Sequence, residues 1–125
     1  MAGPAEYKSE PAGKQADSYL LEWTVVSYTP VTAFKVEIRE VGTTAWRESS
    51  AKPIEDGPYH YAGKEFLKDL TYATRYEARV QARNDEGWSK TKEHFYFATE
   101  GAGLSAFLYL CLSFIFLCFV YFFLF

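Results

Sequence analysis

The chain has 125 residues, a length that suits one globular domain, and its 13 basic and 16 acidic residues give a net charge of −3. All of these charges lie in residues 1–100, and residues 101–125 carry none. The mild negative charge gives no reason to expect a nucleic-acid partner, and the uncharged end excludes a purely soluble protein if that end is retained.

Aromatic side chains are frequent, and 15 of the 24 precede residue 101, which is enough to build a core there. Both cysteines, Cys111 and Cys118, lie in the uncharged end, so no disulfide is expected in the domain. A zinc site would have to rest on His60, His94 and carboxylates alone. With no nucleophile motif and no Gly-rich phosphate loop, we expect no enzymatic activity, no catalytic residue, no metal site and no cofactor.

Residues 1–17 are rich in proline, glycine and charge. They are predicted as a linker that includes a possible first strand over Glu6–Glu10, ended by Pro11 and Gly13.

Two alternating runs follow. In Tyr19–Val26 every second side chain is apolar, and in Phe34–Glu40 the apolar side chains alternate with charged ones. Period-two alternation predicts strands with one buried face, separated here by a break at residues 28–30.

The middle of the chain is less regular. Gly42 marks a turn, and Ala45–Ser49 is a candidate short strand. Residues 50–63 contain two prolines and two glycines and are predicted as a loop, with another short strand over Glu65–Leu70.

The clearest strand is Arg75–Arg83, where small and apolar side chains alternate with charged ones. A hairpin turn over Asn84–Gly87 and a return strand near His94–Thr99 follow, with Phe95 and Phe97 facing inward. Six or seven short strands without a helical period predict an all-β antiparallel sandwich.

Several spaced residues match one family. They are Leu21-x-Trp23, Phe34-x-Val36-x-Ile38, Leu67-x-x-Leu70-x-x-x-Thr74-x-Tyr76, Val80-x-Ala82-x-Asn84-x-x-Gly87-x-Ser89 and Phe97-x-Thr99. Over residues 4–100 the chain resembles a fibronectin type III domain, an immunoglobulin-like fold, with its core at 18–100. The resemblance implies that Trp23 fills the centre of the sandwich. It also implies that Leu70 and Tyr76 form a corner in which the tyrosine hydroxyl bonds nearby backbone.

Together with the apolar end, the domain resembles the membrane-proximal part of neural cell-adhesion proteins of the immunoglobulin superfamily, of the Klingon and Wrapper type. In these proteins immunoglobulin domains come first and an anchor comes last. The resemblance implies a non-enzymatic adhesion or recognition module on the extracellular side of the plasma membrane, whose partner is either another protein or, in homophilic binding, a second copy of the same protein. The sequence shows neither an immunoglobulin domain nor a signal peptide, which a partial gene product would explain. A cytokine-receptor-like subunit and a tail-anchored cytosolic scaffold are the alternatives.

Residues 101–125 are predicted as a C-terminal hydrophobic anchor. The 20 uncharged residues 106–125 would form a helix about 30 Å long, one bilayer core. The small residues Gly101, Ala102 and Gly103, with no basic residue after the apolar run, favour a glycosylphosphatidylinositol (GPI) attachment signal. The short spacer after them favours a retained single span instead.

Contact candidates lie on the strand Arg75–Arg83. Arg75, Arg79 and Arg83 form a basic stripe, on which Trp46 and Trp88 could stack through cation–π contacts. The stripe is either a ligand-facing, heparin-like patch or a solvated sheet face. Trp88 follows the hairpin turn and is the best single contact candidate, the alternative being that its ring packs over the edge of the sheet. The run 87–89, Gly-Trp-Ser, is half of the Trp-Ser motif of cytokine receptors.

Overall fold

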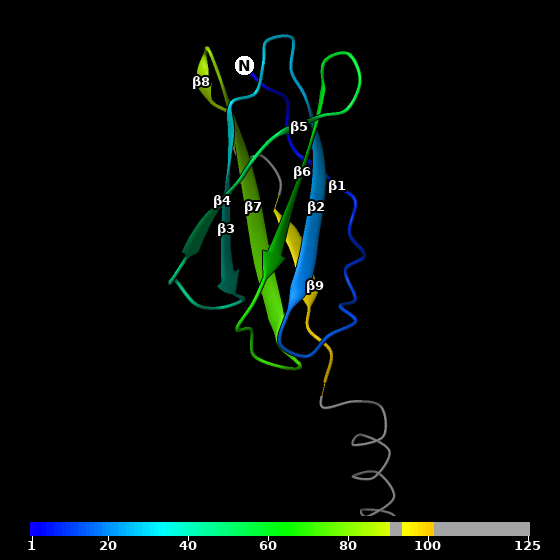
Figure 1. Ribbon diagram of the computed structural model, residues 1–125. Helices are drawn as coiled ribbons and strands as arrows, with labels where there is room; N and C mark the ends of the chain where they lie inside the picture. Colours follow the sequence, from blue (N-terminus) through cyan, green and yellow to red (C-terminus); the bar gives the residue numbers. More distant parts are fainter. Residues whose placement is uncertain (91–93, 102–125) are drawn as a thin grey trace, which may run out of the picture.

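The computed structural model describes residues 1–90 and 94–101, which form two antiparallel sheets packed face to face (Figure 1). One sheet has the strand order β1-β2-β6-β5. The other has the order β4-β3-β7, with β8 and β9 both pairing along β7. The expected all-β antiparallel sandwich is therefore confirmed. The strands are β1 Glu6–Tyr7, β2 Tyr19–Val26, β3 Ala33–Glu40, β4 Arg47–Ala51, β5 Ile54–Glu55, β6 His60–Leu67, β7 Arg75–Asn84, β8 Gly87–Trp88 and β9 Phe95–Ala98.

The core lies between the sheets and follows the alternation of β2, β3 and β7. Every second side chain of these strands is buried. Trp23, at the centre of β2, is 1% exposed, and its ring meets that of Phe34 edge-on at 5.3 Å. The predicted central position of Trp23 is confirmed.

The middle of the chain differs from the prediction. Residues 60–63 belong to β6, which pairs with β2 along the full length of both strands, and they are not part of a loop. Gly63 in this strand reads as a loop signal in the sequence, but it is buried against Trp23. Leu70 lies outside β6, because the chain turns at Asp69 with a φ of 57°. The short strand predicted at 45–49 is also displaced by two residues, to β4.

The last strand is interrupted, since β8 and β9 pair with opposite ends of β7. Between them the Val80 N–H donates to the Tyr7 hydroxyl at 3.2 Å, which replaces a ladder bond at that position. The first segment thus completes the edge of the second sheet.

Residues 1–17, predicted as a linker with a possible first strand, run along the sandwich. The predicted strand is present as β1 but has only two residues, which pair with β2. Farther on, the Gly13 N–H donates to the Ala98 carbonyl at 2.8 Å, and the Ala98 N–H donates to the Pro11 carbonyl at 2.9 Å. This segment therefore crosses from the edge of one sheet to the edge of the other.

The tyrosine corner is present. The Tyr76 hydroxyl accepts a 2.8 Å hydrogen bond from the Thr71 N–H, and both Leu70 and Tyr76 are buried. The bond ties the β6–β7 connection to β7, as the resemblance implied.

The part of the chain that the structure describes contains no helix of the length and apolar character needed to cross a membrane. The helix predicted over 106–125 lies outside the described residues.

Candidate functional site

The two ends of the sandwich differ in what they carry. The chain leaves the sandwich after β9, at the lower end in Figure 1. The opposite end, which we call the loop end, is formed by residues 27–32, 56–60 and 84–87 and also holds the N-terminus. Surfaces at the loop end therefore lie at the opposite end of the sandwich from the point where the described chain ends after β9.

The hairpin turn at the loop end is fixed by its sequence. Asn84 pairs with Gly87, whose φ of 103° suits glycine. The buried Asn84 amide oxygen accepts from the Glu86 N–H at 2.9 Å, and its nitrogen donates to the Ser27 hydroxyl at 3.2 Å. These bonds hold the turn against the β2–β3 connection and so fix the start of β8.

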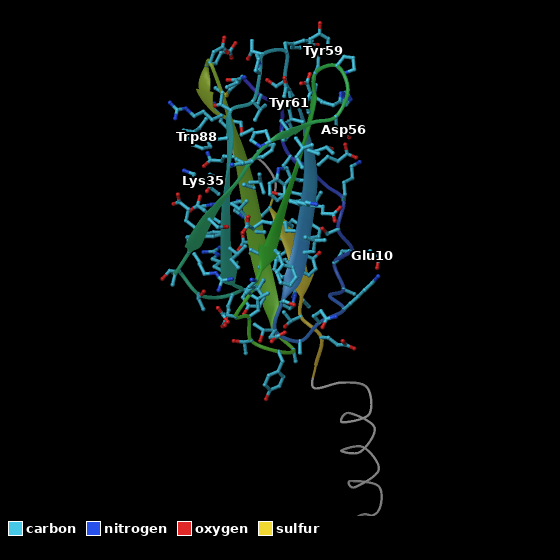
Figure 2. All side chains as sticks on the ribbon, viewed as in Figure 1. Glu10, Lys35, Asp56, Tyr59, Tyr61 and Trp88 are labelled. Carbon is cyan, nitrogen blue, oxygen red and sulfur yellow. The ribbon has the colours of Figure 1, made fainter. Side chains whose placement is uncertain are left out.

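Trp88 lies just after this turn and is 38% exposed. The Lys35 Nζ lies 5.1 Å from the centre of its ring, and the Arg83 guanidinium lies 6.0 Å away. These three side chains come from the neighbouring strands β8, β3 and β7, and we call them the tryptophan patch. Trp88 and Lys35 of this patch are labelled in Figure 2. Among the described residues neither cation forms a salt bridge. An exposed indole beside two uncompensated cations is suited to contact an acidic partner surface.

The predicted arginine stripe does not form one continuous basic patch. Residues four apart on a strand are separated by about 13 Å. Arg79 is neutralised by Glu37, with two N···O distances of 3.2 and 3.0 Å, and its guanidinium stacks 3.8 Å from the centre of the Trp46 ring. Arg75 is exposed at the start of β7 and forms no salt bridge with the described residues. Only Arg83 joins Trp88 at a shared surface.

A buried carboxylate lies on the same sheet face. Glu77 is 4% exposed and accepts from Arg39 Nε at 2.8 Å, and it also contacts the His94 ring. The hydrogen bond from His94, followed by the bond and charge of Arg39, lowers the pKa of Glu77, while burial opposes the shift. Trp46 covers this cluster, with Arg39 4.4 Å from the centre of its ring. These groups satisfy one another, so this part of the face is structural.

A second exposed surface lies at the loop end. Tyr28 is 84% exposed, Tyr59 is 55% exposed, and their ring centres are 5.2 Å apart. The exposed carboxylates Glu55 and Asp56 precede Tyr59 in the chain and form no salt bridge with the described residues. We call these four residues the tyrosine patch.

The backbone beneath the tyrosine patch is well bonded. The Ser27 N–H donates to the Tyr59 carbonyl at 2.8 Å, and the Thr29 hydroxyl donates to Asp85 at 2.7 Å. Tyr59 also has a φ of 63°, which is unusual for a residue with a bulky side chain. Residues held in such conformations cluster at functional sites.

Sequence reasoning found Trp88 and Arg83 but missed Lys35, Tyr28 and Tyr59. The two tyrosines stand in proline-containing breaks, where a tyrosine next to a turn signal was a usable hint of exposure. The partnership of Lys35 with Trp88 depends on which strands are neighbours, which periodicity does not show.

Of the three lipid-attachment candidates, Gly101 is described and is partly buried, while Ala102 and Gly103 lie outside the described residues. In the described ranges, no group of three or more histidine, cysteine, aspartate or glutamate side chains is placed to hold a metal ion.

Comparisons with known proteins agree on the fold. A structure described as a myokine is 22% identical with a TM-score of 0.55, covering 77% of this chain and 92% of its own. A fourth fibronectin type III domain from a human protein is 17% identical with a TM-score of 0.57, covering 82% and 80%. Astrotactin-2, described as a perforin-like membrane protein involved in neuronal development, is 15% identical with a TM-score of 0.60, covering 79% of this chain and 22% of its own. At these identities the likeness concerns the fold alone.

No curated protein shows significant sequence similarity to the chain. The family profile of the fibronectin type III domain, however, matches residues 10–98. This match covers most of the chain and agrees with the two-sheet sandwich and its tyrosine corner, so the chain belongs to the fibronectin type III family.

Proposed function

We propose that this protein is a non-enzymatic recognition module, displayed at the outer face of the plasma membrane and held there by its C-terminal segment. The observation that carries the proposal is the placement of the two ends of the sandwich. The chain passes from β9 toward the uncharged residues 106–125 at one end, and three exposed aromatic side chains, Tyr28, Tyr59 and Trp88, lie toward the other. A module anchored in this way presents its contact surfaces to the outside.

The proposed partner is a protein, and a second copy of this chain is included. Trp88 with Lys35 and Arg83 is the contact surface that we favour, because aromatic and arginine side chains are enriched where binding energy concentrates. This surface is assembled from three strands of a rigid sheet, so little conformational entropy is lost when a partner binds.

Two forms of anchor fit the sequence. Residues 106–125 are long enough to cross a bilayer, and the small residues Gly101, Ala102 and Gly103 precede them. A GPI attachment at this triplet is the form that we favour, and a retained single span is the other.

A finer proposal is that the protein is an adhesion protein of the immunoglobulin superfamily, of the Klingon and Wrapper type, whose immunoglobulin domains would precede this module. The neighbouring gene sequence tests it directly. Immunoglobulin domains and a signal peptide upstream of residue 1 are the expected result. An authentic start at Met1 with a stop codon upstream would contradict it and favour a tail-anchored cytosolic scaffold.

A cytokine-receptor-like subunit is a second candidate, favoured by two observations. The run 87–89 is half of the Trp-Ser motif, and its serine is built into the sheet. The Ser89 N–H donates to the Ala82 carbonyl at 2.8 Å, and the Ser89 hydroxyl accepts from the Ala82 N–H at 3.0 Å. Cations also stack on both tryptophans of this sheet face. Binding of a soluble protein ligand to the domain would favour a receptor over an adhesion module.

The test uses the full gene product with an epitope tag in the exposed turn at Gly42, expressed in animal cells. Staining of unpermeabilised cells is the expected result, and phosphatidylinositol-specific phospholipase should release the domain into the medium. If the domain stays on the cells and mass spectrometry still detects residues 106–125, the anchor is a membrane span and not a lipid. A domain protected from added protease in sealed cells would contradict the extracellular location.

A further inference from the structure

Two surfaces near the loop end carry opposite charges that the described part of the chain does not compensate. The tryptophan patch holds Lys35 and Arg83, and the tyrosine patch holds Glu55 and Asp56. None of these four side chains forms a salt bridge with another described residue. In contrast, Arg39, Arg79 and their carboxylate partners are paired on the same domain. Other charged side chains, such as Arg75, also form no salt bridge with the described residues, but in these two patches unpaired charges of opposite sign lie beside exposed aromatic rings.

The two patches belong to different layers of the sandwich. The tryptophan patch lies on the outer face of the sheet that contains β3 and β7, and the tyrosine patch adjoins β5 and β6 of the other sheet. Figure 2 shows Trp88 and Lys35 on one side of the upper half of the domain, and Asp56 and Tyr59 on the opposite side. A second copy moved sideways without rotation would therefore bring its tyrosine patch against the tryptophan patch of the first.

We propose that the tryptophan patch of one copy binds the tyrosine patch of a second copy standing beside it in the same membrane. Lys35 and Arg83 would face Glu55 and Asp56, and Tyr59 would pack against Trp88. Such a contact joins two different patches. Each copy that binds through one patch can therefore bind a further copy through its other patch, so that a row of copies forms.

This inference rests on the proposed function, because anchoring through the C-terminal segment holds every copy upright with the same end outward. It also confines the copies to a surface, which raises their effective concentration. A weak contact between two charge pairs and two aromatic rings is then sufficient to assemble neighbouring copies.

The test is site-directed cross-linking between two full chains that carry different tags. In both chains Cys111→Ala and Cys118→Ala remove the native thiols, so the introduced cysteines are unique. One chain carries Asp56→Cys and the other Lys35→Cys. They are co-expressed, and opened membranes are treated with a short bismaleimide. The matched control replaces Lys35→Cys with Lys64→Cys, an exposed lysine on the outer face of the other sheet.

A product containing both tags, at least tenfold more abundant for residues 56 and 35 than for 56 and 64, is the expected result. Equal yields for the two pairs would overturn the proposal. A product formed mainly between two copies of Asp56→Cys would also overturn it, because it would indicate a two-fold symmetric contact.

Charge reversal gives a second measurement, by energy transfer between fluorescent tags at the N-termini of full chains. Lys35→Glu with Arg83→Glu should abolish transfer between like copies. Mixing these chains with copies carrying Glu55→Lys and Asp56→Lys should restore it. Transfer that is unchanged by the reversal would contradict the contact.

The outcome can be separated from that of the proposed function. Surface staining reports where the domain lies, whereas cross-linking of opened membranes reports the contact on either side of the membrane. An intracellular domain that still gives the 56–35 product would contradict the proposed location and support the contact. A chain absent from membranes would contradict both.

Discussion

Gly63 lies directly opposite Trp23 on the neighbouring strand, and its missing side chain leaves the space that the indole ring occupies. A Cβ atom at residue 63 would lie 2.4 Å from Cε2 and Cζ2 of Trp23 and 2.6 Å from Nε1. The indole is buried on all sides, so it has no open direction in which to move. The glycine is thus part of the core packing even though the sequence reads as a loop at that point.

Gly63→Ala should lower the free energy of unfolding by about 1 to 3 kcal/mol, the usual cost of forcing an extra carbon into a packed core. Urea unfolding of residues 1–101 measures the change. The matched control is Gly101→Ala, where the nearest atom is the Ala73 Cβ at 3.9 Å. Equal unfolding midpoints for the wild-type protein and Gly63→Ala would contradict the close packing of residues 23 and 63.

Trp23→Ala should cost about 3 to 5 kcal/mol, because it leaves a large cavity at the centre of the sandwich. In that background Gly63→Ala should cost much less than it does alone, since the ring that it meets is gone. A double-mutant cycle of unfolding free energies measures this coupling. Additive effects would show that the two residues do not interact. A loss below about 1 kcal/mol for Trp23→Ala would contradict the central position of Trp23.

Tyr76→Phe should lower stability by about 1 kcal/mol, because the Thr71 N–H loses its acceptor in the corner. Thermal or urea unfolding measures the effect. Tyr72→Phe serves as the control, since Tyr72 lies beside Thr71 in the β6–β7 connection but is 61% exposed. The corner would lose its assigned role if both variants behaved alike.

The sequence predicted the sandwich well where a single periodicity dominates. In β2, β3 and β7 the alternation alone places the buried side chains, and the motif around Tyr76 predicts the corner. The sequence-based prediction failed at His60–Leu67, where Gly63 interrupts the alternation. The reason for the glycine lies on the opposite strand, because the ring of Trp23 fills the space beside it.

The candidate site was predicted less completely. Trp88 and Arg83 lie close in sequence, next to one hairpin turn, so local reasoning could find them. Lys35 reaches Trp88 from β3 across β7, and Tyr28 meets Tyr59 from another loop. Such pairs depend on the order of strands in the two sheets, which no local pattern contains.

Stability should depend on Glu77 in acid. Since His94 and Arg39 lower the pKa of Glu77 in the folded chain, the folded state favours the carboxylate. The resulting stabilisation is fully present above the ordinary pKa of about 4.5 and is lost as the pH falls through the lower folded value. Four side chains face this carboxylate. They are Arg39 from β3, His94 just before β9, Tyr96 in β9, and Trp46, which covers the cluster.

Urea unfolding of the wild-type protein and of Glu77→Gln over a pH series measures this dependence. The variant should be less stable at neutral pH, and its stability should fall less steeply below about pH 4.5. Parallel pH profiles for the two proteins would contradict the assigned interaction of Glu77 with its neighbours.

Trp88→Ala should separate binding from folding. The ring is exposed at the surface, so its removal should change the unfolding free energy by no more than about 0.5 to 1 kcal/mol. In the cross-linking assay between residues 56 and 35, its loss should lower the yield about tenfold, as expected for an aromatic residue at the centre of a contact. An unchanged yield would remove Trp88 from the contact surface.

The claim that the domain is held at a membrane through residues 104–125, either as a lipid-attachment signal or as a retained span, is tested most directly by fractionating cells. The full gene product is compared with a variant that ends at Gly103, and membranes are washed with alkaline carbonate before both fractions are blotted for the domain. The full product should remain with the washed membranes, and the shortened variant should be found in the soluble fraction or the medium. Recovery of both proteins in the soluble fraction would contradict the tether, and with it the proposed display of this domain at the cell surface.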